Sequence, residues 1–327
     1  MWPFDTYSPW NMPIGSGARY APVNANGKTA FTPKVDVFEE RTIWVPTAST
    51  PLRDVYDNDG SGGTFRFRYR IRIDPNWYPA GAFNVANPLP WFRGGNMDLP
   101  MDVFSADRTQ VYELFGVPYP LENPMQVDDA RAPYSATGMG ISPTPDAQIG
   151  TRAYGGSGIA GTVRAGETTT PGGIRHVLAA IVHTKDLNRY GPGGKPYVWP
   201  ATSADTGAFY GTTGNVYMGS LLAIPPGINI NALPLQTAQA RELARVLQDY
   251  GVYIVDTHGG AEGELRLVLH PNATPDVGGW NSSLRTAIAA DMRIVLELLQ
   301  VVTNNSPTSV GGGGTPRRPL APPFARN

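Results

Sequence analysis

The segment TFRFRYRIRI, residues 64–73, decides the fold class because its side chains alternate in character without exception. Apolar or aromatic residues occupy every odd position from 65 to 73, and arginines occupy every even position between them. Successive side chains of a β-strand point to opposite faces, so this pattern predicts a strand with one apolar and one cationic face. Asp59-Gly60 and Gly62-Gly63 come just before it and are typical of a hairpin turn.

The composition extends this prediction to the whole chain. The 327 residues include 38 glycines and 32 prolines, about twice the usual share of these two residues. Both are unfavourable inside helices, which excludes a helix bundle, while a hydrophobic fraction of 41% is enough for a core. We therefore predict a mainly β protein, a jelly-roll-like β-sandwich with long Gly/Pro loops and two helices in the C-terminal third.

Other segments carry the patterns of individual elements. Short strands are predicted over residues 39–46, 108–116, 174–184, 196–200, 216–224, 251–256 and 264–270. Two segments instead repeat apolar residues at helical spacing, and we predict helices over residues 235–250 and 283–302.

The two ends of the chain differ in composition from the part between them. Residues 1–35 are rich in aromatics and prolines, which predicts an extended arm, and we expect residues 36–302 to form the sandwich domain. Residues 303–327 predict a Gly/Pro-rich tail with a flexible linker at Gly311–Gly314. Such segments are ordered only when something holds them, so we expect both ends to dock on neighbouring subunits. The predicted assembly residues are Trp2, Phe4, Trp10, Arg317, Arg318 and Phe324.

Several classes of chemistry are excluded by what the sequence lacks. It has no cysteine, which rules out disulfides, thiolate metal sites and cysteine nucleophiles, and no phosphate-binding or zinc-protease motif. Residues 57–62 (DNDGSG) resemble the start of a calcium loop, but Arg68 stands where that loop needs a glutamate. A net charge of −1 and short apolar runs argue against nucleic-acid binding and membrane insertion. We expect no cofactor and no metal.

The cationic face of residues 64–73 is the first candidate binding surface. A ladder of guanidinium groups suits a sulfated or uronic polysaccharide or an acidic partner, and tryptophans in Pro/Gly loops suit stacking on sugar rings. The alternative is a solvated strand face, and because like charges repel, we expect carboxylates opposite it. The binding candidates are Arg66, Arg68, Arg70, Arg72, Trp77 and Trp91.

A second group of residues fits acid–base catalysis. The stretch VDTHGG places a carboxylate and an imidazole two residues apart on one face of a strand end. The short stretches AAIVH (179–183), NVYMG (215–219) and ELRL (264–267) resemble motifs of the alginate-lyase jelly rolls, in a different order. The alternative is a polar strand end that enters a glycine turn. The catalytic candidates are Asp256, His258 and Glu264, or His183 with Tyr217 and Arg266.

Longer stretches of the chain resemble a largely uncharacterised family of bacterial and phage proteins that open with an SPWNxP motif. These stretches cover about half of the chain: YSPWNMPIGSGARY (7–20), SGIAGTVRAGE (157–167), GGIRHVLAAIVH (172–183), YVWPATSADTG (197–207), IPPGINI (224–230) and ARELARVLQDYGVYIVDTHGG (240–260). The resemblance implies a β-sandwich and transfers no catalytic residue. The bacterial members look secreted, whereas this sequence starts directly at the arm, without a basic and apolar leader.

These observations favour a phage virion structural protein of the tail, fibre or decoration type, located on the exterior of the particle. We expect it to act by packing against other virion subunits or itself, as a homo-oligomer, and to bind host-surface carbohydrate. One alternative is a polysaccharide lyase or glycoside hydrolase built on a β-sandwich. The other is a secreted carbohydrate-binding module.

Overall fold

The computed structural model describes residues 3–33, 36–58, 64–74, 100–117 and 123–320. Within these ranges more residues lie in strands than in helices, so the predicted mainly β class is confirmed. The jelly-roll connectivity is not confirmed, because a jelly roll is antiparallel and the described sheets include parallel pairs such as β11–β13 and β3–β6.

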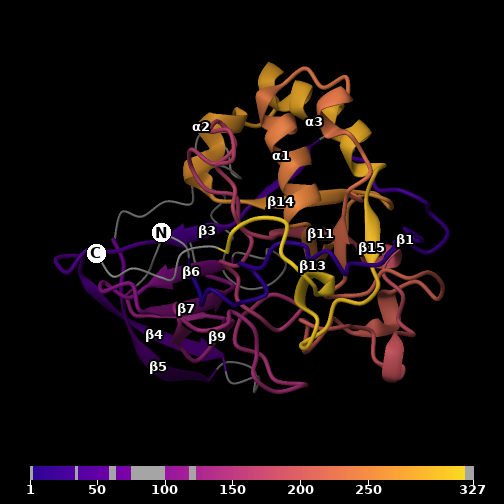
Figure 1. Cartoon of the computed structure of the whole chain (residues 1–327). Coiled ribbons are helices and arrows are strands. Elements are labelled where there is room, and N and C mark those ends of the chain that lie inside the picture. Colours follow the sequence, from indigo (N-terminus) through magenta and orange to yellow (C-terminus); the bar gives the residue numbers. More distant parts are fainter. Residues whose placement is uncertain (1–2, 34–35, 59–63, 75–99, 118–122, 321–327) are drawn as a thin grey trace.

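A seven-stranded mixed sheet forms the larger half of the molecule (Figure 1). Its strands, in spatial order, are β1 (Tyr20–Pro22), β15 (Gln300–Val302), β12 (Leu221–Ala223), β13 (Val252–His258), β11 (Leu178–His183), β14 (Leu265–Leu269) and β2 (Phe38–Glu40). The helices α1 (Ala238–Asp249), α2 (Thr274–Val277) and α3 (Ser283–Leu296) gather on one side of this sheet. The inner strand β11, between β13 and β14, is the apolar run LAAIVH, whose first five residues are all buried, as expected for a strand covered on both faces.

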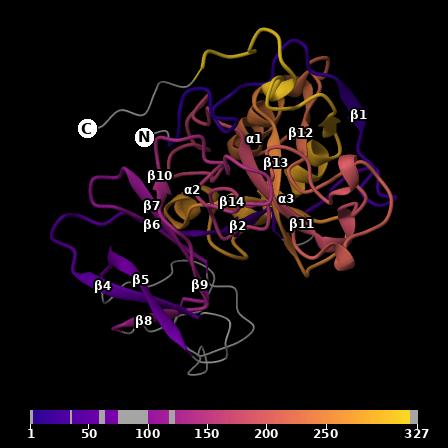
Figure 2. The ribbon, with the colours of Figure 1, turned by 90° about the horizontal axis from the view of Figure 1, so that it is seen from below.

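The smaller half contains two further sheets and projects from the first (Figure 2). One contains β10 (Tyr134–Ser135), β7 (Gln110–Phe115), β6 (Met101–Phe104) and β3 (Thr42–Trp44), with β9 (Asp129–Ala130) also paired to β7. The other contains β5 (Phe65–Arg72), β4 (Leu52–Asn58) and β8 (Met125–Val127). Ile71 and Ile73 belong to a hydrophobic core of this half that is separate from the main core.

Six single-turn 3₁₀ helices occupy the described loops. They are η1 (Thr184–Asp186), η2 (Pro192–Gly194), η3 (Gly207–Phe209), η4 (Ile230–Ala232), η5 (Pro271–Ala273) and η6 (Val310–Gly312).

All but one of the predicted strands and helices are present, with some boundaries changed. The alternating segment is β5, which pairs antiparallel with β4; the predicted turn falls on residues outside the described ranges. The predicted strand over 39–46 is two short strands in different sheets, β2 and β3, with Arg41 between them. The predicted helix over 283–302 ends at Leu296, because the chain then turns and adds β15 to the large sheet. Residues 196–200 are not a strand, since they make a single bridge, Tyr197 to Met218.

The N-terminal arm packs into the protein's own core. Phe4 and Trp10 are each 1% exposed, and the Trp10 indole contacts the rings of Tyr154 and Tyr253 at centroid distances of 5.8 and 5.2 Å. The prediction that Phe4 and Trp10 contact a neighbouring subunit is therefore wrong, because both side chains are already buried within the chain. Trp2, Trp77, Trp91 and Phe324 lie outside the described residues.

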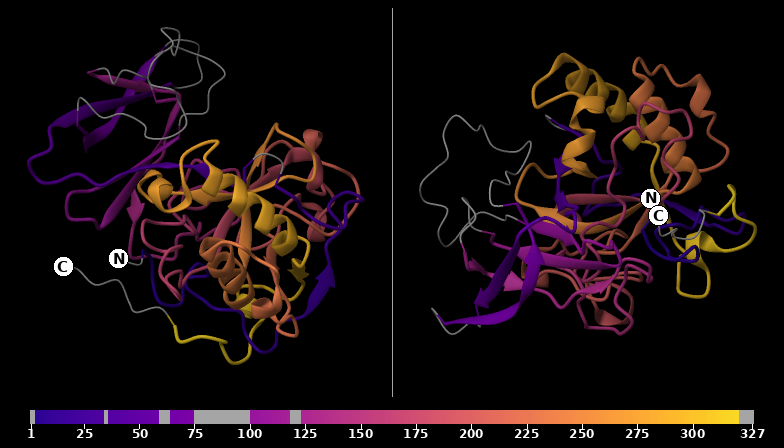
Figure 3. Two further views of the ribbon diagram at one scale, coloured as in Figure 1. Left: turned by 90° about the horizontal axis from the view of Figure 1, so that it is seen from above. Right: turned by 90° about the vertical axis from the view of Figure 1, so that its left-hand side faces the viewer.

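The C-terminal segment 303–318 runs beside residues 13–20 and forms what we call the terminal clasp (Figure 3). The amides of Gly15 and Gly17 donate to the carbonyls of Gly311 and Gly313 at 2.9 and 2.8 Å. All four glycines from 311 to 314 have positive φ, and a Cβ on Gly312 would lie 2.5 Å from Ala18 Cα. The predicted flexible linker is therefore wrong: these glycines are needed for a tight, ordered contact between backbones.

The two arginines predicted for assembly also contact their own chain. The Arg318 guanidinium lies 2.7 Å from Asp249 at the end of α1, and the Arg317 guanidinium lies 3.9 Å from the same carboxylate. These contacts hold the tail without a second subunit.

Candidate functional site

A half-open groove of about 950 Å³ lies at the edge of the large sheet, and we call it the aromatic groove. Strand residues Leu221, Val301 and Val302 line it, together with loop residues from segments 139–145, 192–202, 215–220 and 303–307. Its volume is at the upper end of the range of small-molecule sites in proteins. The groove is therefore large enough for a ligand of several rings.

Three half-buried aromatic side chains, Tyr197, Trp199 and Tyr217, line the aromatic groove. Their two segments lie side by side, because the Val198 amide donates to the Met218 carbonyl at 2.9 Å. Gly219 makes this approach possible, since it has a φ of 84° and a Cβ there would lie 2.0 Å from the Val198 carbonyl oxygen.

Asp146, Lys195 and Tyr197 form a hydrogen-bonded group at the aromatic groove, in which Lys195 and Tyr197 line the groove and Asp146 lies beside it. The Lys195 ammonium donates to both Asp146 carboxylate oxygens, at 2.7 and 2.6 Å, and to the Tyr197 hydroxyl at 3.0 Å. The Tyr197 hydroxyl donates to Asp146 at 2.6 Å. Hydrogen bonds from Lys195 and Tyr197 lower the pKa of Asp146, and the hydrogen bond to Asp146 raises the pKa of Lys195. Both groups of the pair are therefore ionised near neutral pH.

Most of the predicted catalytic residues meet at another place, the far end of β11, β13 and β14. His183 is the register partner of His258, and their rings lie 6.0 Å apart. Asp256 and Arg266 are both register partners of Ile181, on opposite sides of it. Asp256, His258 and Glu264, which the sequence analysis grouped together, thus lie at one end of the sheet, and His183 and Arg266 of the alternative group lie there as well.

The two carboxylates of this cluster, Asp256 and Glu264, each form an ion pair with an arginine. The Glu264 carboxylate is 3% exposed and lies 3.0 Å from Arg266. Burial raises the pKa of Glu264, but the hydrogen bond and charge of Arg266 outweigh it, so the net shift is downward. Arg152, which the sequence analysis did not single out, lies 3.3 Å from Asp256 and 3.4 Å from Glu39.

Histidines at the carboxyl ends of β11, β13 and β14 cap turns; His183 and His258 share one end of the sheet, and His270 lies at the opposite end because β14 is antiparallel to β11. His258 Nδ1 accepts from the Gly260 amide at 2.9 Å, so in the neutral ring Nε2 carries the proton and faces the Glu264 carbonyl at 3.3 Å. His183 and His270 likewise accept through Nδ1 from the amide two residues on, at 3.2 and 2.9 Å. Burial, together with nearby Arg266, lowers the pKa of His258 to about 4.

This geometry favours the second of the two interpretations of VDTHGG, a polar strand end that enters a glycine turn. Both ring nitrogens of His258 are engaged with backbone, and the neighbouring carboxylates are paired with arginines. Tyr217, predicted to join His183 and Arg266, instead lines the aromatic groove, whose wall includes neither of them. The six predicted catalytic residues are thus split between two places.

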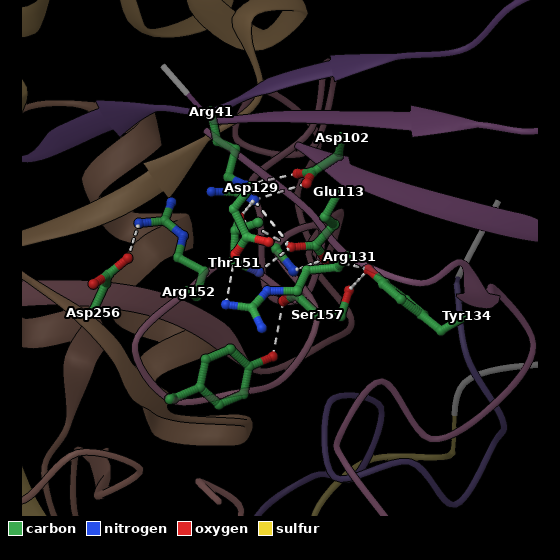
Figure 4. A network of polar contacts seen from close by, with 12 residues as sticks. Arg41, Asp102, Glu113, Asp129, Arg131, Tyr134, Thr151, Arg152, Ser157 and Asp256 are labelled. Atoms are coloured by element: carbon green, nitrogen blue, oxygen red, sulfur yellow. Dashed lines mark hydrogen bonds and ion pairs between the residues drawn. The ribbon is translucent and has the colours of Figure 1, made fainter. Parts of the chain in front are cut away.

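A second polar network, buried between the two halves of the molecule, was not anticipated from the sequence (Figure 4). Arg41, at the point where the chain passes from β2 to β3, donates to both oxygens of Asp102 at 2.7 Å and lies 3.3 Å from Glu113. Glu113 also accepts from the Thr151 and Gly158 amides, at 2.7 and 2.5 Å. Burial and the charge of Asp102 raise the pKa of Glu113. We call Arg41, Asp102 and Glu113 the buried triad.

The arginine stripe of β5 is paired within its own hairpin. Arg68 lies 3.2 Å from Asp57, Arg70 forms an ion pair with Asp54, and Arg72 donates to the Thr50 carbonyl at 2.6 Å. The expectation of carboxylates opposite the stripe is confirmed, and they come from this chain. These pairings favour a structural role for the stripe over a polysaccharide surface.

Within the described part of the chain, no group of three or more His, Asp or Glu side chains is placed to hold a metal ion. No helix among the described residues is both long and apolar enough to cross a bilayer. Comparison with protein-family models, with curated proteins and with solved structures finds no match to this chain.

Proposed function

We propose that this protein binds an oligosaccharide in the aromatic groove. The observation that carries the proposal is the half-open cavity of about 950 Å³ lined by Tyr197, Trp199 and Tyr217. Sugar rings have apolar faces that pack on aromatic side chains, and hydroxyls that need hydrogen-bond partners at the edge. Hydroxyl and amide side chains such as Thr144 and Asn215 line the same groove.

A binding role is better supported than catalysis. Acid–base cleavage of a glycan needs two ionisable groups that converge on the bound substrate. Among the described residues that line the aromatic groove there is no carboxylate and no histidine. The candidates Asp256, His258 and Glu264 lie elsewhere and are held by ion pairs and turn contacts.

The proposal applies to both settings predicted from the sequence, a virion surface protein and a secreted binding module. The virion role and the homo-oligomer stay predictions. The ordered ends of the chain no longer support them, because Trp10 packs in the main core and the tail is held by the terminal clasp.

The test is a glycan-array screen of the whole chain, followed by calorimetric titration of the oligosaccharides that bind. We expect Trp199→Ala and Tyr217→Ala each to weaken binding about tenfold, the usual scale for loss of one aromatic contact. Phe209→Ala is the matched control, because Phe209 is an aromatic side chain that is 67% exposed and does not line the aromatic groove.

Thermal unfolding of each variant establishes that the fold is retained. The proposal fails if the wild-type protein binds no oligosaccharide. It also fails if the two groove variants bind as well as Phe209→Ala does.

A further inference from the structure

We infer that the aromatic groove selects uncharged oligosaccharides over acidic ones, and that Asp146 is the residue that sets this selectivity. The inference rests on the proposed function and names the class of sugar that the groove takes. It is argued from the charges at the groove and from the hydrogen bonds that those charges already make.

Lys195 is the one charged residue among the described residues that line the aromatic groove. Left alone, its ammonium would attract the carboxylate of a uronic acid or a sulfate ester. An ammonium has three N–H donors, and Lys195 meets three acceptors in its own chain: the two Asp146 oxygens and the Tyr197 hydroxyl. The Asp146 carboxylate therefore already neutralises this ammonium, which weakens its attraction for an anionic ligand.

Asp146 is held in position by its backbone as well as by its side chain. It has a φ of 60°, in the left-handed region that aspartate adopts more readily than most non-glycine residues. Its amide donates to the Thr202 carbonyl at 3.0 Å, and Thr202 itself lines the groove. The carboxylate is therefore fixed beside Lys195.

The Asp146 side chain is 68% exposed, so its oxygens face solvent while they hold Lys195. A carboxylate is a strong acceptor for sugar hydroxyls and repels a uronate or sulfate. Asp146 thus acts twice against an acidic glycan, by pairing with Lys195 and by presenting a negative charge of its own. An uncharged polyol meets neither obstacle.

The decisive variant is Asp146→Asn, which keeps the size of the side chain and removes its charge. The probes are oligogalacturonate, which carries one carboxylate on each ring, and uncharged maltooligosaccharides and cellooligosaccharides. We expect Asp146→Asn to bind oligogalacturonate about tenfold more tightly than the wild-type protein at low ionic strength, and we expect added salt to remove the gain. The gain should also disappear in the double variant D146N/K195Q, in which the released ammonium is absent.

The inference is overturned if the wild-type protein prefers oligogalacturonate to every uncharged glycan that it binds. It is also overturned if Asp146→Asn, shown by thermal unfolding to be folded, gains no affinity for oligogalacturonate. In the first of these results the proposed function survives, because the groove still binds a sugar. If the wild-type protein binds no glycan of any class, both the proposed function and this inference fail.

Discussion

The ion pair around Glu167 gives a quantitative prediction for the variant Glu167→Gln. Glu167 lies in the loop before β11, is 12% exposed, and contacts both Arg164, at 3.0 Å, and His176, at 3.2 Å. Burial raises the pKa of this carboxyl, but His176 and Arg164 outweigh burial and lower the pKa from 4.5 to about 2. The native state therefore stabilises the ionised form of Glu167 relative to the unfolded chain.

The magnitude follows from linkage between protonation and folding. At about 1.4 kcal/mol for each tenfold change in proton affinity, the lowered pKa contributes about 3 kcal/mol to the free energy of unfolding at pH 7. For a carboxyl with a lowered pKa, this contribution is complete above the unfolded value of 4.5 and is lost as the pH falls towards 2. About 2 kcal/mol of it should be gone at pH 3.

The assay is urea unfolding followed by circular dichroism, at several pH values from 7 to 3. We expect Glu167→Gln to be about 3 kcal/mol less stable than the wild-type protein at pH 7 and only about 1 kcal/mol less stable at pH 3. Glu297→Gln is the control, because Glu297 is exposed at the end of α3, and it should change stability by less than about 0.5 kcal/mol. A difference between Glu167→Gln and wild type that stays constant with pH would refute the reasoning.

Two further predictions concern the contacts that join distant parts of the chain. Arg41→Met leaves the two carboxylates of the buried triad without a cation and should destabilise the protein by about 3–5 kcal/mol in guanidinium unfolding. Arg70→Ala removes an exposed ion pair and should have a much smaller effect; equal effects of the two variants would contradict a special role for the buried triad. Gly312→Ala places a Cβ against Ala18 and should make the terminal clasp more susceptible to limited proteolysis. Gly166→Ala is the control, because Gly166 has a similar φ and open space around it, and its cleavage should not change. Unchanged cleavage of Gly312→Ala would argue against a tight clasp.

Patterns within short stretches of the sequence predicted those strands and helices whose residues repeat at a regular spacing along the chain. The alternation of residues 64–73 predicted β5, and the apolar stripe of residues 235–250 predicted α1, because strand and helix periodicity depend on backbone sterics alone. The VDTHGG stretch also predicted that Asp256 and His258 share one strand end, since residues two apart on a strand face the same way.

The role of each group was decided by contacts between segments far apart in the chain. Asp146 and Lys195 are 49 positions apart, and Gly15 meets Gly311 from the opposite end of the sequence. No periodicity marks such pairs, so the sequence predicted Gly311–Gly314 as a linker and left His258 open between a catalytic group and a residue of a glycine turn.

The sequence by itself thus determined the mainly β class, the alternating strand β5 and the helix α1, because these depend on short-range sterics and on the spacing of apolar residues. Only the tertiary structure decided which charges are paired, which aromatics line a groove and which ends are held. The physical reason is that the partner of an ionised or aromatic side chain is chosen by packing, and packing is set by the whole chain at once.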